Sequence, residues 1–122
     1  MTLRDDSISM RQMLDHAREA IQFTVGKSLD DVLKDRLLGL GLVRLMEIFG
    51  EAANRIPPET RALHPRVQWR QAINTRNRLI HGYDTVDLKI LYDIIRHELP
   101  AVVAELERIL EPGGEDDDTG AD

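Results

Sequence analysis

The fold of this chain is organised around one basic stretch, Trp69-Arg70-Gln71-Ala72-Ile73-Asn74-Thr75-Arg76-Asn77-Arg78-Leu79-Ile80-His81-Gly82-Tyr83. Its apolar residues recur at helical spacing, which predicts a helix over residues 67–80 with one face in the core. Arg76 lies in the middle of that face. Because a guanidinium keeps its proton, burial there requires an anion from the protein or from a ligand. Glu51, on the preceding predicted helix, is the candidate partner within the protein.

Further polar groups gather at the end of this predicted helix. Asn77 and His81 are four residues apart, so on a helix the amide can fix the orientation or the tautomer of the imidazole. Gly82 is a usual residue for a left-handed helix cap, which predicts the end of the helix. Tyr83 follows directly. Arginine, imidazole and phenol are therefore expected at one helix C-terminus, whose partial negative charge favours a protonated histidine.

The spacing Arg76-Asn77-x-x-x-His81-x-Tyr83, with Trp69 upstream, resembles the R-x-x-x-x-H-x-Y motif of the HEPN superfamily. The likeness is greatest to the HepT-like toxins and extends over about residues 8–110, including the run Ile48-Phe49-Gly50-Glu51-Ala52-Ala53. It implies a homodimeric helical bundle that cleaves RNA, with tRNA and mRNA as candidates, without a metal or another cofactor.

The resemblance also implies a partner protein. In HepT-like toxins the tyrosine of the motif is where an antitoxin, a minimal nucleotidyltransferase (MntA-like), attaches AMP. For this chain it implies the toxin component of a toxin–antitoxin system, with Tyr83 as the modified residue and with ATP and magnesium used by the partner. AMP at Tyr83 would place charge and bulk at the mouth of the site and exclude RNA.

Charge is unevenly distributed along the chain. The net charge is -6, but six of the 22 acidic residues lie in the last twelve positions, which leaves 16 acidic residues against 16 basic ones. Within that neutral body, residues 60–83 contain five arginines and no acidic residue. A local basic segment of this kind favours phosphate contact, so Arg70 and Arg78 are candidate RNA-binding residues. Surface arginines that cluster by chance are the alternative.

Composition restricts the other possibilities. The 122 residues are 42% hydrophobic and only 4% aromatic, which favours one helical domain. The absence of cysteine excludes disulfides and thiolate metal sites and is compatible with the cytoplasm. No apolar run approaches the ~18 residues that a membrane helix needs, and the N-terminus lacks the apolar core of a signal peptide. We expect a cytoplasmic protein with no metal site and no membrane contact.

Four amphipathic segments are predicted, at residues 7–25, 28–56, 67–80 and 87–110, with one extra turn at 59–63. They can bury their apolar stripes only against one another, so an all-α antiparallel bundle of four to five helices is expected. The expected starting residues are Ser7, a Ser28–Asp31 capping box, and Asp87. Pro100 must bend or break the last helix.

The domain boundaries follow from these segments. Residues 1–6 are a polar lead-in, residues 7–111 form the single HEPN-like domain, and residues 112–122 are expected to be a disordered acidic tail.

Two features of the long second segment leave alternatives open. Gly39 and Gly41 each cost a helix interior ~1 kcal/mol relative to alanine, which suggests close approach of another helix or another chain, or else a kink. Glu51 belongs to a stripe at intervals of three and four, and can pair on the surface instead of turning toward Arg76. That stripe consists of Arg44, Glu47, Glu51 and Arg55.

Metal-free RNA cleavage needs a base, an acid and a cation that holds the charged phosphorane. His81 and Arg76 fit these roles, with Asn77 and Glu51 supporting them. One imidazole cannot easily serve as both base and acid, and residues five apart on a helix point about 140° apart. We therefore expect a composite site at the interface of a homodimer. The alternative is a non-catalytic helical dimer that binds a nucleotide or a nucleotidyltransferase partner.

Overall fold

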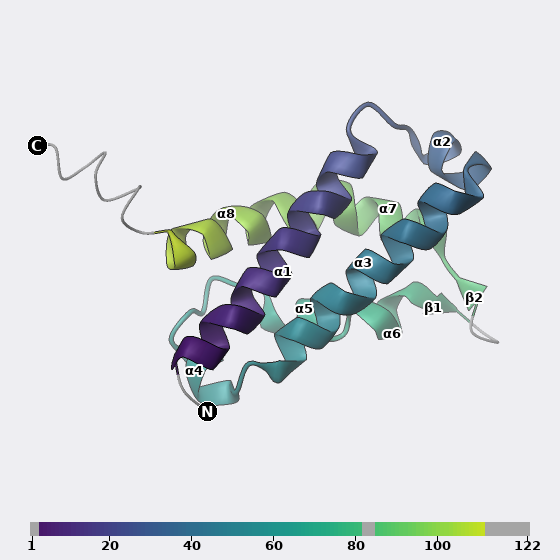
Figure 1. Cartoon of the computed structure of the whole chain (residues 1–122). Helices are drawn as coiled ribbons and strands as arrows, with labels where there is room; N and C mark the ends of the chain where they lie inside the picture. Colours follow the sequence, from purple (N-terminus) through teal and green to yellow (C-terminus); the bar gives the residue numbers. More distant parts are fainter. Residues whose placement is uncertain (1–2, 82–84, 112–122) are drawn as a thin grey trace, which may run out of the picture.

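The computed structural model describes residues 3–81 and 85–111, and it is a bundle of helices with one short hairpin (Figure 1). The elements in chain order are α1 (Leu3–Thr24), α2 (Leu29–Lys34), α3 (Arg36–Arg55), α4 (Pro58–Ala62), α5 (Trp69–Ile73), α6 (Thr75–Leu79), β1 (Ile80–His81), β2 (Thr85–Val86), α7 (Leu88–Asp93), the π-helix η1 (Ile94–Glu98) and α8 (Leu99–Leu110). The predicted all-α bundle is confirmed.

The core lies between α1, α3 and the helical segment that runs from α7 through η1 to α8. Helices α1 and α3 lie side by side and run in opposite directions, and the C-terminal segment passes behind them (Figure 1). Their apolar stripes interlock through side chains that are fully buried. The largest of these are Phe49, Met13, Leu14, Leu42, Met46 and Leu106.

Most predicted caps are present. Ser28 and Asp31 form the expected capping box, with the Ser28 Oγ accepting from the Asp31 N–H at 3.1 Å and the Asp31 carboxylate accepting from the Ser28 N–H at 2.9 Å. The Asp87 carboxylate accepts from the N–H groups of Lys89 and Ile90 and so begins α7. These local signals are confirmed because each cap satisfies backbone donors that the helix leaves free.

The start predicted for the first helix is wrong, because α1 begins at Leu3 and Ser7 lies inside it. The four extra residues are held by a tertiary contact, since the buried carboxylate of Asp6 accepts a hydrogen bond from the Thr60 hydroxyl of α4 at 2.5 Å. Residues 3–6 are therefore part of the helix and not a polar lead-in.

The predicted helix over residues 28–56 is divided at Asp35. This residue ends α2 with an extended backbone, and its carboxylate then accepts from the Leu38 N–H at 3.0 Å and begins α3. A side chain that can cap a helix competes with continuation of the preceding one. Neither Gly39 nor Gly41 interrupts α3, and Gly39 allows a close approach, since a Cβ there would lie 3.7 Å from the Leu88 side chain.

Pro100 changes the last helix in the predicted region without ending it. It has no N–H and lies at the start of α8, and the turn before it widens into η1, where the Leu99 N–H donates to the Ile94 carbonyl five residues back. The wider turn relieves the clash between the proline ring and the preceding carbonyl.

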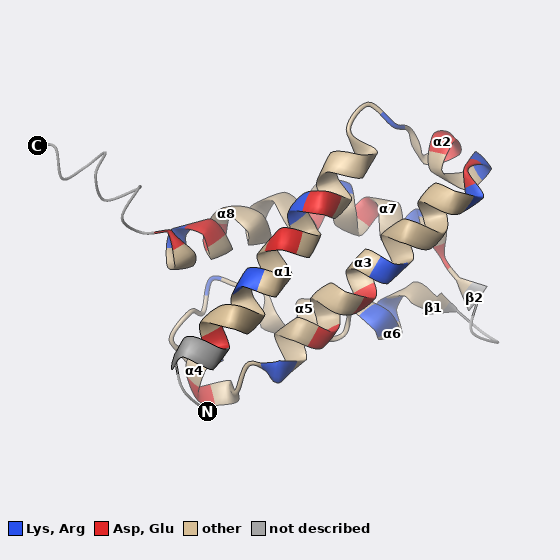
Figure 2. Ribbon diagram, viewed as in Figure 1, with Lys and Arg blue, Asp and Glu red and all other residues tan. Residues whose placement is uncertain are grey.

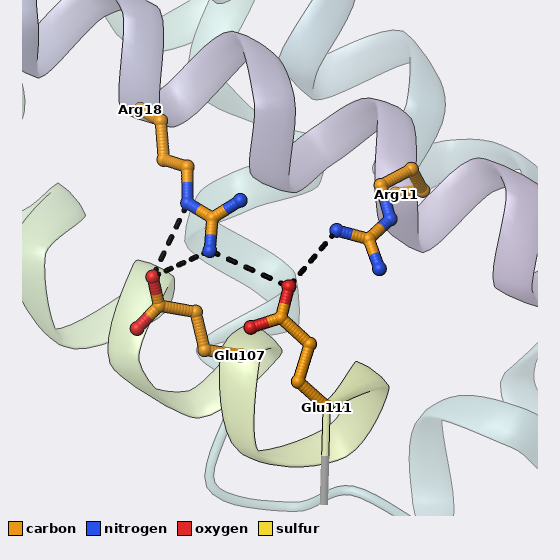
Figure 3. A network of polar contacts seen from close by, with 4 residues as sticks. All are labelled: Arg11, Arg18, Glu107 and Glu111. Atoms are coloured by element: carbon orange, nitrogen blue, oxygen red, sulfur yellow. Dashed lines mark hydrogen bonds and ion pairs between the residues drawn. The ribbon is translucent and has the colours of Figure 1, made fainter. Parts of the chain in front are cut away.

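Ion pairs on the surface join the first and last helices (Figure 3). The Arg18 guanidinium donates to Glu107 at 2.7 and 3.2 Å and lies 3.6 Å from Glu111, which also accepts from Arg11 at 3.1 Å. The hydrogen bond to Glu107 raises the pKa of Arg18. Because the four side chains are about 40% exposed, water screens the network and its contribution to stability is small. Within the described ranges, no helix is both long and apolar enough to cross a bilayer.

Candidate active site

The candidate site begins where α3 packs against the junction of α5 and α6. Gly50 lies so close to this junction that a Cβ there would be 3.2 Å from the Ala72 carbonyl oxygen. The buried Thr75 hydroxyl donates to the same carbonyl at 2.7 Å and to the Gln71 carbonyl at 3.1 Å. Trp69 anchors the other end by donating from its indole to the His64 carbonyl at 2.9 Å. Residue 50 is thus the point at which the long helix positions the basic stretch.

The single helix predicted over residues 67–80 is divided at Asn74, and this changes which residue faces the core. The buried positions of α5 and α6 are Trp69, Ala72, Thr75 and Leu79. Thr75 fills the position expected for Arg76, because a small side chain that satisfies its own hydroxyl fits where two backbones approach closely.

Arg76 is therefore exposed, and the prediction that it lies on the core-facing side is wrong. Its guanidinium makes no hydrogen bond or ion pair with any residue that the structure describes. An exposed guanidinium does not need a protein anion to offset its desolvation. Among the described residues, nothing neutralises the positive charge of Arg76.

His81 lies in a strand and not on the helix. Helix α6 ends at Leu79, and Ile80 and His81 pair in antiparallel register with Val86 and Thr85. The Asp87 N–H donates to the Leu79 carbonyl at 2.8 Å and so satisfies a group that the end of the helix leaves free. The helix therefore ends one residue before the predicted bound at residue 80, and its C-cap is Ile80, so Gly82 is not the cap that was expected. Gly82 and Tyr83 themselves lie outside the described residues.

This change also alters the expected roles of the supporting residues. Asn77 and His81 no longer share a helical stripe, so the expected orientation of the imidazole by an amide one turn earlier does not apply. Asn77 and Glu51 are both exposed. Among the described residues no ion pair joins Glu51 to Arg76, so Glu51 does not turn inward as its anion.

The two predicted RNA-binding arginines differ in their surroundings. Arg70 is exposed on α5. Arg78 is engaged in a two-pronged ion pair, donating to the Glu98 carboxylate at 2.9 and 2.6 Å, and this hydrogen bonding raises the pKa of the Arg78 guanidinium. Figure 2 shows the basic residues of α6 beside the mixed acidic and basic stripe of α3. Among the described residues, the basic stretch therefore presents Arg70 and Arg76 as arginines with no ion pair and Arg78 as a paired one.

The structure also contains a pocket of about 260 Å³ between the α5–α6 segment and the η1–α8 segment. Sequence reasoning did not predict it, because its walls come from segments that are distant in the sequence, residues 66–78 and residues 94–102. The only sequence signal is that Gln68, Gln71, Ala72, Thr75 and Arg78 follow one another at intervals of three, one, three and three. That spacing places them on one helical stripe.

Comparison with known proteins identifies the family of the chain. A family model described as "Ribonuclease HepT-like" matches residues 13–109, which extend from the core of α1 to the last turn of α8. The chain belongs to the HepT-like ribonuclease family. The resemblance found in the motif from Arg76 to Tyr83 is confirmed at the level of the family, and the enzyme class is that of the ribonucleases.

Individual relatives cover nearly the whole HepT-like domain. A protein of Thermococcus cleftensis named "Probable ribonuclease HepT" is 31% identical over 105 residues, which is 83% of this chain and 96% of that protein. A protein of Caldanaerobacter subterraneus subsp. tengcongensis named "Putative RNase TTE0752" is 33% identical over 105 residues, covering 83% and 94%. No solved structure matches the chain.

Proposed function

We propose that this HepT-like chain is a metal-independent endoribonuclease in which Arg76 and His81 act on the scissile phosphate. Arg76 holds the negative charge that develops on the phosphorane, and His81 transfers a proton to or from the reacting oxygens. tRNA and mRNA are the candidate substrates. The observation that carries the proposal is the exposed guanidinium of Arg76, which forms no ion pair with a described residue and lies one helical turn before the strand that contains His81.

The local structure supports these roles, because the backbone next to Arg76 and His81 is held by hydrogen bonds. Arg76 directly follows Thr75, whose side chain is 1% exposed and whose hydroxyl is fixed on two carbonyls. The short pairing of β1 with β2 holds the backbone of His81 immediately after α6. Charged groups stabilise a transition state best when the fold has already oriented them, since no reorganisation is then needed.

We also propose that two protomers complete the site. The single imidazole proposed for the site, that of His81, is half of an acid–base pair, and exposed apolar residues of α1 and α3 form a surface that a second copy can cover. This surface, the α3 patch, consists of Phe23, Leu37, Leu40 and Gly41, with Leu37 80% and Leu40 53% exposed. Phe23, Leu37 and Gly41 line one shallow groove. Exposed apolar surface of this kind is typical of protein–protein contacts.

The position of the α3 patch is compatible with a shared site. Gly39, on the opposite side of α3 from Gly41, packs against Leu88, the first residue of α7 and two residues after β2. The patch is thus on the segment of α3 whose opposite side packs against the first residue of α7, close in sequence to β2. Gly41 has open space around it, so its cost within the helix is explained if a partner helix approaches there.

Membership of the family also suggests a biological role for this ribonuclease. We propose the toxin component of a toxin–antitoxin pair, silenced when a minimal nucleotidyltransferase attaches AMP to Tyr83. What supports it is the order of residues, because Tyr83 follows His81 by two positions in the sequence. AMP on Tyr83 would add a phosphate, which an arginine such as Arg76 can bind.

The direct test is cleavage of a labelled tRNA and a labelled mRNA fragment by the purified chain, with and without EDTA. Cleavage that continues in EDTA and is lost in both Arg76→Ala and His81→Ala supports the proposal. The second candidate, a non-catalytic dimer that binds a nucleotide or a nucleotidyltransferase, predicts RNA or partner binding by wild type with no cleavage. Cleavage that stops in EDTA would contradict the mechanism.

A further inference from the structure

The pocket between the α5–α6 stripe and the η1–α8 segment, here called the α8 pocket, has a composition unlike that of an ordinary surface depression. Its floor is apolar and is formed by Phe49, Ala72, Ile94, Leu99 and Val102. Its rim is polar and is formed by Arg66, Gln68, Gln71, Arg78, His97 and Glu98. An apolar cavity with a few convergent polar groups is the usual form of a small-molecule site.

We propose that the α8 pocket binds one unpaired base of the RNA substrate, next to the site of cleavage. This inference rests on the proposed ribonuclease function and adds a specificity site to it. A base has two flat apolar faces and an edge of donors and acceptors, which matches an apolar floor and a rim of amides and guanidinium groups. At about 260 Å³ the pocket is smaller than the roughly 300–1,000 Å³ typical of drug-sized ligands, so it suits a single ring system.

The charge of the rim favours a nucleotide. Six lining residues come from the acid-free segment 60–83, and two of these are Arg66 and Arg78. The one carboxylate, Glu98, is neutralised by Arg78 through two hydrogen bonds. Arg66 is exposed and makes no hydrogen bond or ion pair with any described residue. The rim therefore has a net positive charge that attracts the phosphates flanking a base.

The pocket and the candidate catalytic arginine share one short helix. Thr75 and Arg78 line the pocket, whereas Arg76, between them in sequence, is rotated by about 100° from Thr75 and does not line it. A helix with its side chains is about 10–12 Å wide, so a strand held at Arg76 reaches the pocket by passing around α6. The π-turn Ile94–Glu98 forms the opposite wall and carries His97 and Glu98 to the rim. Single π-turns are frequent at functional sites.

The best test fills the pocket from a position that does not disturb the core. Ala101 lines the pocket and is exposed on α8, so Ala101→Trp places a ring over the floor. Ala104 is exposed on the same helix and does not line the pocket, so Ala104→Trp is the matched control. Gln71→Glu on the opposite rim is a second, smaller change that repels a nucleotide and remains usable if Ala101→Trp folds poorly.

Binding is measured first, with the four nucleoside 5′-monophosphates and NMR of the isoleucine, leucine and valine methyl groups. We expect at least one nucleotide to shift the Val102 and Ile94 methyl signals of wild type and of Ala104→Trp. We expect binding about tenfold weaker in Ala101→Trp and in Gln71→Glu. If none of the four nucleotides shifts these signals, the inference is wrong. The same holds if a nucleotidyltransferase partner shifts them and nucleotides do not, because the pocket is then a protein-docking site.

Cleavage kinetics then separate the two proposals. With a single-stranded RNA substrate, Ala101→Trp should raise KM about tenfold and leave kcat within about twofold, since the pocket binds without taking part in the chemistry. It should also reduce the preference for one base beside the cut. If wild type binds nucleotides in the pocket but does not cleave RNA, the ribonuclease proposal fails while the base site is retained. If wild type cleaves RNA and both tryptophan variants match it in KM and base preference, the base site is wrong and the ribonuclease proposal is retained.

Discussion

Gly50 of α3 packs against the carbonyl of Ala72 so closely that a Cβ there would lie 3.2 Å from the carbonyl oxygen. This contact determines at which position along α3 the α5–α6 junction packs. Because Thr75 is bonded to the same carbonyl and Arg76 follows it, the contact also determines where the exposed guanidinium lies relative to the long helix. A glycine that contributes nothing to the chemistry thus positions a candidate catalytic residue.

Gly50→Ala is expected to destabilise the fold by about 1 kcal/mol. Alanine has a helix propensity ~1 kcal/mol more favourable than glycine. The added methyl group, however, would crowd the Ala72 carbonyl at a cost of about 1–3 kcal/mol, because a backbone carbonyl cannot move aside as a flexible side chain can. Gly41→Ala is the matched control, since nothing lies within 4 Å of a Cβ there, and it should stabilise the protomer by up to about 1 kcal/mol. Urea unfolding of both variants at equal dimer occupancy measures the difference. A Gly50→Ala protein more stable than Gly41→Ala would contradict the packing argument.

The α3 patch is expected to hold two protomers together. Leu37→Glu places a charge at a leucine that is 80% exposed, so it should leave the protomer folded and convert the dimer to a monomer of 13.9 kDa in sedimentation. Leu63→Glu, at a leucine 68% exposed elsewhere on the surface, is the control and should remain dimeric. If the active site is composite, Leu37→Glu should also lose RNA cleavage, because a monomer lacks the residues of the second protomer. A wild-type protein that sediments as one chain at micromolar concentration would overturn the dimer proposal.

Arg76→Ala and His81→Ala are each expected to reduce kcat by about 10²–10³, the effect of removing one group that stabilises a transition state. Because Arg76 is exposed and unpaired among the described residues, Arg76→Ala should change the free energy of unfolding by less than about 0.5 kcal/mol. Arg11→Ala, at a surface ion pair far from α6 in the sequence, should keep full activity. Arg76→Ala that cleaves RNA at the wild-type rate would remove the arginine from the mechanism.

Tyr83 is expected to receive AMP from a nucleotidyltransferase partner. Incubation of the chain with that partner, magnesium and labelled ATP should label wild type and leave Tyr83→Phe unlabelled, while cleavage by wild type falls as labelling proceeds. Tyr92→Phe is the control, since Tyr92 is the other tyrosine and its hydroxyl donates to the Lys27 carbonyl at 2.5 Å. Equal labelling of wild type and Tyr83→Phe would show that any modification lies elsewhere.

The capping box of α2 is expected to make stability depend on pH. The Ser28 N–H and hydroxyl lower the pKa of Asp31 in the folded protein. A carboxyl group with a lowered folded pKa stabilises the fold above its unfolded pKa, and this stabilisation is lost as pH falls through the folded pKa. Asp31→Asn should therefore be less stable than wild type at about pH 7, and the difference should shrink at about pH 2. A difference in unfolding free energy that is the same at both pH values would contradict this assignment.

Local sequence signals were sufficient to predict the all-α class, several of the helix termini and the family motif. The helix termini were predictable because caps are local: Ser28, Asp31 and Asp87 bond to backbone groups within three residues. The family could be recognised because Arg76, His81 and Tyr83 keep their order and spacing whatever conformation the chain adopts there.

Which side of the basic stretch is buried depends on tertiary contacts that the sequence pattern does not reveal. Helical periodicity placed Arg76 in the core, because a uniform helix over residues 67–80 would have carried it there. The close approach of Gly50 favoured the small Thr75 instead, and the pairing of Ile80 with Val86 took His81 off the helix. The α8 pocket likewise could not be predicted from the sequence, because its walls come together only when α5 and α6 pack against η1 and α8. Contacts between segments distant in sequence fixed each of these features, and local spacing contains no information about such contacts.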